Sequence, residues 1–175
     1  MMFDIDPVFG WLATAALSLL FAAASVAKLR DLTRFSGVLE AYAVLPAALV
    51  PLIARLLPLL EIVVAVGLVW PMTRNGAAWG AGGLLFIYGA GIALNLARGR
   101  RDLDCGCEGF GRRHPIAGWM LARNALIIGL AALAGAPATA RALVATDLLT
   151  IAGGLAAFAF VYFAADELLG QSTPA

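Results

Sequence analysis

Long apolar runs alternate with short polar segments along the whole chain. Three runs contain no charged residue and are 18 to 22 residues long, close to the roughly 20 apolar residues that a helix needs to cross a bilayer. Two further runs of comparable length contain a few ionisable or polar side chains. No period-two alternation typical of strands passes through these segments. We therefore predict an all-α integral membrane protein, a bundle of about five transmembrane helices with spans at about 9–27, 47–70, 76–97, 116–136 and 148–165.

The residues before the first run indicate that this run is a retained span. Asp4 and Asp6 precede it, and no Lys or Arg does. A secretory signal peptide begins with basic residues. We therefore expect the first span to stay in the mature protein.

A short amphipathic helix is predicted directly after the first span. Its apolar residues Leu32, Phe35, Leu39 and Tyr42 are spaced by three, four and three positions, which places them on one face of a helix. Pro46 marks the end of this segment. We expect the helix to lie in the membrane interface with its apolar face towards the lipid.

The composition agrees with a membrane protein and excludes several other classes. Hydrophobic residues make up 62% of the chain and charged residues 13%, where a soluble domain has about 25% charged residues. A net charge of +1 leaves no basic surface for nucleic acid. The longest loops, 28–46 and 98–115, are too short for a globular domain. We interpret residues 1–175 as one polytopic membrane domain whose chemistry lies in the bundle or in these loops.

Lys and Arg are concentrated on one side of the predicted bundle. The loops after the first and third spans hold eight of them, and the C-terminal tail on the same side adds none. The N-terminus and the two other loops hold two. Because basic residues favour the cytoplasmic side of a membrane, this count predicts that segments 28–46 and 98–115 face the cytoplasm.

The two cysteines of the chain, Cys105 and Cys107, are separated by Gly106 alone. They lie in segment 98–115, here called the Cys-Gly-Cys loop. Glycine allows the backbone torsions of a tight turn, and cysteines this close can come within disulfide distance. A disulfide in so small a ring is strained, and strained disulfides exchange readily. We therefore predict thiol–disulfide exchange, with Cys105 and Cys107 as the reacting pair.

Charged neighbours of the cysteines bear on this chemistry. Arg100, Arg101 and His114 supply positive potential, which favours the reactive thiolate. Asp104, directly before Cys105, opposes it. We therefore include these residues and Gly106 as the supporting part of the site.

Two other interpretations of the cysteines stay open. Cys105, Cys107 and His114 could bind a soft metal ion, in a metal carrier or sensor. The step of seven residues from Cys107 to His114 matches no standard zinc spacing, however. Alternatively, both cysteines could be small residues in a turn of a non-redox assembly scaffold.

Polar side chains inside or at the ends of the spans are candidates for an intramembrane site. Charged groups in a membrane are costly and usually face the bundle interior or a polar cavity. Glu61 in the second span needs a cationic partner, and we expect Arg123 first and Lys28 second. Asn95 and Asn124 lie near the loop ends of their spans, so we expect them to line a polar pocket beneath the Cys-Gly-Cys loop.

Several short motifs together resemble one known family. They are Ser25-x-x-Lys28, Tyr42-x-Val44-Leu45-Pro46, Pro58-x-x-Glu61, Asp104-Cys-Gly-Cys107 and Arg123-Asn124. Over about residues 10–136 this pattern is similar to the MauE family of methylamine utilisation proteins, within the broader MauE/DoxX group of redox-associated membrane proteins. The family often has Phe-Gly directly after the second cysteine, whereas Glu108 and Gly109 follow Cys107 here.

The resemblance implies a role in biogenesis. The family is associated with maturation of the exported, disulfide-rich β subunit of methylamine dehydrogenase, through its processing, transport or disulfide formation. A thioredoxin-like protein, MauD-like, is linked to the same task. The resemblance thus implies a multi-pass protein of the bacterial inner membrane, with the lipid bilayer, the thioredoxin-like protein and the β subunit as partners.

Two expectations about the Cys-Gly-Cys loop disagree. The charge count places it in the cytoplasm, whereas disulfides of an exported subunit form outside the cytoplasm. The residues identify no cofactor. A single cysteine pair can pass electrons across the membrane only with a second carrier, and a membrane quinone is the candidate for that carrier.

Overall fold

The computed structural model describes residues 5–106, 115–137, 139 and 141–171. The described residues form helices and contain no strand. The helices are α1 (Pro7–Arg30), α2 (Leu32–Tyr42), η1 (Ala47–Leu49), α3 (Val50–Val69), α4 (Arg74–Ala97), α5 (Gly118–Gly135) and α6 (Ala145–Gln171). In this part of the chain, five helices are long and apolar enough to cross a membrane when η1 is counted with α3. The predicted five-helix membrane bundle, with a short helix after the first span, is confirmed.

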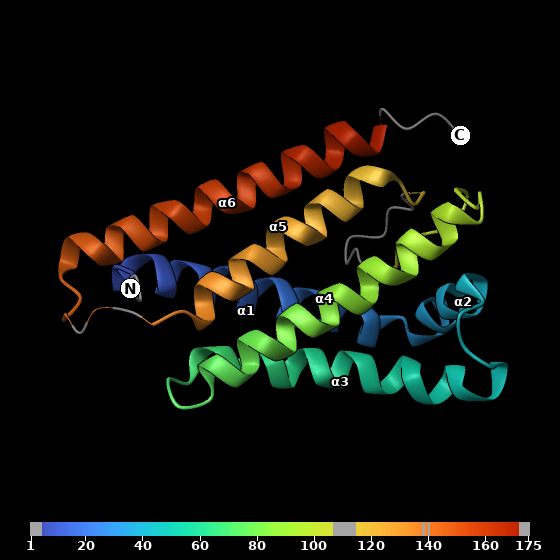
Figure 1. The fold of residues 1–175 in the computed structure, drawn as a ribbon, viewed down its shortest axis with the longest axis horizontal. Helices are drawn as coiled ribbons and strands as arrows, with labels where there is room; N and C mark the ends of the chain where they lie inside the picture. Colours follow the sequence, from blue (N-terminus) through green and yellow to red (C-terminus); the bar gives the residue numbers. More distant parts are fainter. Residues whose placement is uncertain (1–4, 107–114, 138, 140, 172–175) are drawn as a thin grey trace.

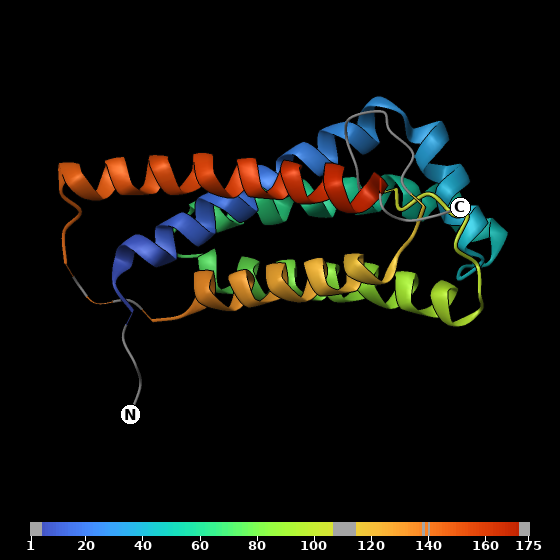
Figure 2. The same ribbon diagram turned by 90° about the horizontal axis from the view of Figure 1, so that it is seen from above.

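The five long helices run roughly along the long axis of the molecule, and α2 lies at one end (Figures 1 and 2). The start of α3, the end of α4 and the start of α5 lie at that same end, which we call the loop end. The turn between α3 and α4 and the start of α6 lie at the opposite end. The chain after α1 and the chain after α4 therefore meet at the loop end.

The core lies where α1, α3, α4 and α5 pack together. Leu17 and Phe21 of α1 and Leu68 of α3 are fully buried there. Small residues such as Ala81 of α4 and Ala131 of α5 allow the helices to approach closely. Large apolar side chains on the outer faces of the helices are exposed, as expected for a surface in contact with lipid.

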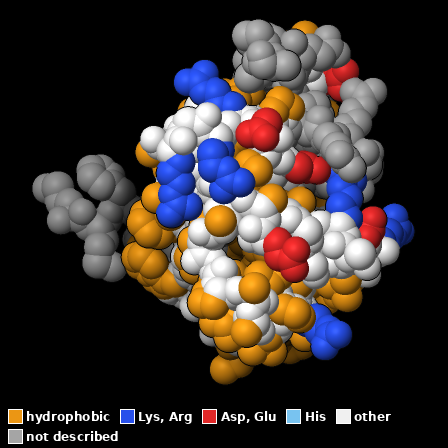
Figure 3. Space-filling view, turned by 90° about the vertical axis from the view of Figure 1, so that its right-hand side faces the viewer, with side chains coloured by type: hydrophobic (Ala, Val, Ile, Leu, Met, Phe, Trp, Pro, Cys, Tyr) orange, Lys and Arg blue, Asp and Glu red, His pale blue; other side chains and the backbone are white. Residues whose placement is uncertain are grey.

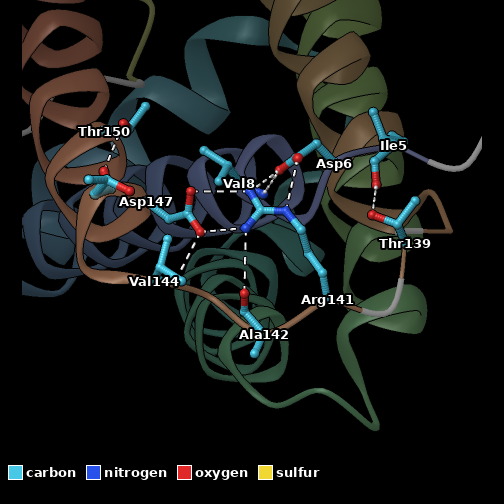
Figure 4. A network of polar contacts seen from close by, with 10 residues as sticks. Ile5, Asp6, Val8, Thr139, Arg141, Ala142, Val144, Asp147 and Thr150 are labelled. Atoms are coloured by element: carbon cyan, nitrogen blue, oxygen red, sulfur yellow. Dashed lines mark hydrogen bonds and ion pairs between the residues drawn. The ribbon is translucent and has the colours of Figure 1, made fainter.

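An ion-pair network at the end opposite the loop end joins the start of α1 to the start of α6 (Figure 4). Arg141 donates hydrogen bonds to Asp6 at 2.9 Å and to Asp147 at 2.6 Å. Asp6 also caps α1 by accepting from the Val8 amide at 3.0 Å. The hydrogen bonds from Arg141 and Val8 lower the pKa of Asp6 below its usual value. The network positions the segment before α6, although exposed ion pairs contribute little stability.

The apolar face of α2 lies partly against protein, not against lipid as we expected from the sequence. Asp31 caps the helix by accepting from the Arg34 amide at 2.9 Å. Phe35 is buried, and its ring centroid lies 5.5 Å from the Lys28 ammonium. The Tyr42 hydroxyl donates to the Cys105 carbonyl at 3.4 Å. A cation and a carbonyl attract these aromatic side chains in a way that lipid chains do not.

Basic and acidic side chains at the loop end are interspersed with apolar ones (Figure 3). Two of the basic residues that we counted to predict the membrane orientation form ion pairs at this end. Lys28 contacts Glu61 at 2.5 Å, and Arg34 contacts Asp104 at 2.8 Å. The second pair links α2 to the Cys-Gly-Cys loop.

Candidate functional site

The two described ends of the Cys-Gly-Cys loop are held together next to the start of α5. The Ile116 amide donates to the Leu103 carbonyl at 2.9 Å. Asp104 and Pro115 form an isolated antiparallel bridge. These contacts hold the residue before Cys105 against the end of the loop. Cys107 and His114 lie outside the described residues.

Gly106 is required at its position for two reasons. Its φ of +67° lies in the left-handed region, which side chains with a Cβ rarely adopt. A Cβ at this position would also lie 2.7 Å from Val38 Cγ1 of α2. The Gly106 amide donates to Asp104 Oδ1 at 3.3 Å, and Arg34 of α2 donates to Asp104 Oδ2 at 2.8 Å. Helix α2 therefore forms one wall of the turn that carries Cys105.

We predict that Gly106→Ala separates α2 from the Cys-Gly-Cys loop and destabilises the protein by more than the roughly 1–2 kcal/mol cost of a left-handed residue. Gly99→Ala is the matched control, because Gly99 has φ +75° but no heavy atom within 4 Å of the place that a Cβ would take. Thermal unfolding in detergent measures both. Adding Val38→Ala should recover only the steric part of the Gly106→Ala loss. Equal losses for Gly106→Ala and Gly99→Ala would contradict this account.

Cys105 is buried, with 6% of its surface exposed. It packs in an apolar cluster with Ile92, Leu103, Ile116 and Met120. The Arg123 guanidinium, from the first third of α5, donates to Cys105 Sγ across 3.8 Å. A guanidinium at this position stabilises negative charge on the sulfur.

The arginine beside the sulfur is not one of those that we expected from the sequence. Arg100 donates to Asn95 Oδ1 at 3.3 Å, and Arg101 is exposed. Arg123 instead reaches Cys105, and its guanidinium stacks on Trp119 at 5.2 Å and on Tyr162 at 5.7 Å. Cation–π contacts of this kind hold the guanidinium in place.

No group of three or more His, Cys, Asp or Glu side chains suited to a metal ion occurs among the residues that the structure describes. The alternative metal set of Cys105, Cys107 and His114 has only its first member in that part of the chain. The metal interpretation therefore remains an expectation from the sequence.

A buried ion pair lies within the bundle near the loop end. The Lys28 ammonium contacts Glu61 Oε1 at 2.5 Å, and their side chains are 5% and 1% exposed. The Tyr88 hydroxyl also donates to Glu61 Oε1, at 2.8 Å. The expectation that Arg123 is the first partner of Glu61 is wrong, because Lys28 occupies that place and Arg123 contacts Cys105.

Two of the sequence motifs explain this pairing. Ser25 and Lys28 are three residues apart on α1, as are Pro58 and Glu61 on α3, so each pair lies on one helix face. Ser25 Oγ donates to the Pro58 carbonyl at 2.8 Å, one turn from the ion pair. The two motifs therefore contact each other along the interface of α1 and α3.

A pocket lies between all five long helices, next to the ion pair. It is small, with a volume of about 30 Å³ that has room for only a few water molecules, and it is partly open to the outside. Its polar lining is Lys28, Glu61, Tyr88, Arg123, Asn124 and Tyr162. The expected polar pocket thus exists, but Asn95 does not line it. Asn95 is fully buried nearby and donates to the Gly91 carbonyl at 3.1 Å.

Sequence reasoning missed three residues of this site. Tyr88 lies in an uninterrupted apolar run, and only its hydroxyl distinguishes it from its neighbours. Tyr162 lies in the last span, to which we assigned no chemistry. Arg34 entered the sequence analysis only as one of the basic residues, although in the structure it contacts Asp104 of the Cys-Gly-Cys loop. Polar aromatic residues within spans are the signal that could have identified the first two.

Comparison with known proteins gives one consistent result. The family model described as "Methylamine utilisation protein MauE" matches residues 6–137. Methylamine utilization protein MauE of Paracoccus denitrificans is 36% identical over 172 residues, which cover 97% of this chain and 92% of that protein. The protein of the same name from Methylophilus methylotrophus is 33% identical over 172 residues, covering 94% and 88%.

A third relative covers a shorter part of the chain. Methylamine utilization protein MauE of Methylorubrum extorquens is 42% identical over 120 residues, which cover 69% of this chain and 64% of that protein. No solved structure matches the chain.

Proposed function

We propose a function from one premise: the chain belongs to the MauE family of methylamine utilisation proteins. It is a multi-pass membrane protein of the methylamine utilisation system. Our proposal is that, in the bacterial inner membrane, it assists maturation of the exported methylamine dehydrogenase β subunit. It acts by thiol–disulfide exchange between the Cys105–Cys107 pair and a thioredoxin-like protein.

The contact between Arg123 and Cys105 is the observation that carries this proposal. A structural cysteine in an apolar cluster needs no cation, yet a guanidinium held by two aromatic rings donates to this sulfur across 3.8 Å. Such a cation stabilises a thiolate that leaves or attacks during exchange. Gly106 has a left-handed backbone conformation, and the second cysteine follows Cys105 by two positions in the sequence.

The burial of Cys105 assigns different roles to the two cysteines. A protein partner has no access to a sulfur that is 6% exposed, so we assign the bond with the partner to Cys107. A partner thiolate attacks Cys107 of the loop disulfide, which breaks the Cys105–Cys107 bond and leaves a Cys105 thiolate beside Arg123. The second partner thiolate then attacks the mixed disulfide. The partner ends as a disulfide, and its two protons pass to the loop cysteines.

The double variant Cys105→Ser/Cys107→Ser tests the proposal against a non-redox scaffold. We expect it to reach the membrane at the normal level but to yield no mature methylamine dehydrogenase. A host that carries the double variant and still assembles active dehydrogenase at the wild-type level would refute a thiol mechanism. Such a result would support the scaffold interpretation.

The side of the membrane on which the loop lies can be measured directly. Direct exchange with an exported protein requires the loop to lie outside the cytoplasm, whereas the excess of basic residues at the loop end favours the cytoplasm. Intact cells are first treated with a membrane-impermeant reductant, which opens the Cys105–Cys107 disulfide if the loop is outside, and a membrane-impermeant maleimide should then label Cys107. Labelling only after lysis would rule out direct contact with exported partners.

A further inference from the structure

Helix α6 lies along one side of the bundle and is the least buried of the five spans (Figures 1 and 2). None of the residues in its most apolar stretch is buried, whereas 28% to 39% of the residues in the corresponding stretches of the other four spans are. The match to the family model ends at residue 137, before α6 begins. Burial in the core therefore does not explain what this helix contributes.

One aromatic side chain of α6 reaches the candidate site. The centroid of the Tyr162 ring lies 5.7 Å from the Arg123 guanidinium, within the roughly 6 Å over which a cation and an aromatic face attract each other. Both side chains line the small pocket between the long helices. Phe158, one turn earlier on α6, stacks on Tyr162 with 6.2 Å between the ring centroids. Helix α6 thus presents an oriented ring to the cation that contacts Cys105.

The Arg123 side chain is held by contacts with two different helices. An arginine side chain is long, and in a membrane protein it tends to extend towards water. Trp119 lies one turn before Arg123 on α5 and stacks on its guanidinium at 5.2 Å. This contact is local to α5, whereas the contact with Tyr162 comes from α6. The position of the guanidinium therefore depends on how α6 is seated against the bundle.

Helix α6 approaches α1 closely at a glycine. A Cβ at Gly154 would lie 2.9 Å and 3.0 Å from the two Cδ atoms of Leu12 on α1. The preceding Gly153 has no heavy atom within 4 Å of the place that a Cβ would take. Gly154 and Tyr162 are eight positions apart, about two helical turns, so they lie on roughly the same side of α6. The close approach at Gly154 therefore also sets how near Tyr162 comes to α5.

We propose that Tyr162 is a positioning residue for the Cys105 sulfur, because its ring holds the Arg123 guanidinium there when α6 is seated on α1. In taking Cys105 as a reacting group, the inference rests on the proposed function. Without the ring, water fills the space beside the guanidinium and hydrates it. The guanidinium then spends less time at the 3.8 Å that separates it from Cys105 Sγ. Negative charge on the sulfur is stabilised less, and the thiolate forms at a higher pH.

Alkylation by iodoacetamide of the full chain carrying Cys107→Ser, in phosphatidylcholine nanodiscs, tests the proposal. Cys105 is then the one cysteine of the chain. Its thiolate displaces iodide, and intact-protein mass spectrometry gives the rate across the pH range in which thiols titrate. The midpoint of the rate profile reports thiolate formation, and the plateau reports access of the reagent. Asp104, its partner Arg34 and the Tyr42 hydroxyl also lie at this turn, and every variant below retains them.

Tyr162→Leu should raise the midpoint by about half a pH unit, the value of one cation–π contact. Tyr162→Phe keeps the ring and should keep the midpoint of the parent chain. Arg123→Gln removes the cation and gives the upper limit of the shift. Gly154→Leu should reproduce the shift by moving α6 away from Leu12, whereas Gly153→Leu, where there is space, should not. Far-UV circular dichroism checks that each variant is folded.

Three results would overturn the positioning role. One is an unchanged midpoint in folded Tyr162→Leu when Arg123→Gln raises it. Another is a midpoint that Tyr162→Phe raises as much as Tyr162→Leu, because the ring is then not what matters. The third is an equal shift in Gly154→Leu and Gly153→Leu, which would mean that the seating of α6 on α1 does not determine the shift.

The proposed function fails on a different measurement. Normal dehydrogenase maturation with Cys105→Ser/Cys107→Ser would overturn thiol exchange. It would leave the effect of Tyr162 on the alkylation of Cys105 unchanged, because that assay needs no partner and no dehydrogenase.

Discussion

Cys105→Ser should accumulate a mixed disulfide between Cys107 and the thioredoxin-like partner, at a level at least about tenfold above that of Cys107→Ser. Cys105 is buried beside Arg123. Its thiolate can therefore attack Cys107 of the mixed disulfide and release the partner, but it cannot itself form a disulfide with another protein. Without Cys105, this chain has no second thiolate to break the disulfide between Cys107 and the partner. The partner variant retains only its attacking cysteine and is added as its mixed disulfide with thionitrobenzoate, so that the Cys107 thiolate attacks the partner sulfur and thionitrobenzoate leaves. The measurement is non-reducing electrophoresis of the membranes after acid quenching.

Arg123→Gln provides the matched control for that trapping experiment. It leaves both cysteines in place but removes the cation 3.8 Å from Cys105 Sγ. We expect exchange with the partner to be slower. Little mixed disulfide should accumulate, because Cys105 is still present to release the partner from Cys107. If Cys107→Ser traps the partner and Cys105→Ser does not, the assignment of roles from burial is wrong. Equal trapping by both variants would show that both sulfurs reach the partner.

The membrane architecture could be predicted from the sequence because the thickness of the bilayer fixes the length of an apolar span. Five largely apolar runs in this chain have about that length, and the helices α1 and α3 to α6 follow them. The spacing of Phe35 and Tyr42 likewise identified α2. It did not reveal what covers its apolar face, because a helical period is the same whether the neighbour is lipid or protein.

The contacts of the candidate site depend on how the helices are turned relative to each other, which one sequence does not state. Lys28 and Arg123 are both cations near the loop end, so either was chemically suited to Glu61. The packing of Ser25 on Pro58 selects Lys28, because it places the same faces of α1 and α3 together. The Arg123 contact with Cys105 requires the Cys-Gly-Cys loop to fold back over α5. A contact between residues this far apart in the chain leaves no local pattern in the sequence from which it could be predicted.

Lys28→Met should destabilise the protein by about 3–5 kcal/mol, the usual cost of removing one partner from a buried ion pair. The side chains of Lys28 and Glu61 are 5% and 1% exposed, so the carboxylate that loses its partner stays largely out of bulk water. Arg34→Gln is the matched control, because its pair with Asp104 is 33% and 18% exposed. That change should cost no more than about 1 kcal/mol. Unfolding by SDS in mixed micelles, followed by far-UV circular dichroism, gives both values.

The double variant Lys28→Met/Glu61→Gln distinguishes a coupled pair from two independent side chains. Gln retains an oxygen that accepts from the Tyr88 hydroxyl, which donates to Glu61 at 2.8 Å, and neither replacement is charged. We expect the double variant to be more stable than Lys28→Met, because it no longer buries an unpaired carboxylate in a medium where charge is costly. Losses that simply add would mean that the two residues stabilise the bundle separately, and that the ion pair does not hold α1 against α3.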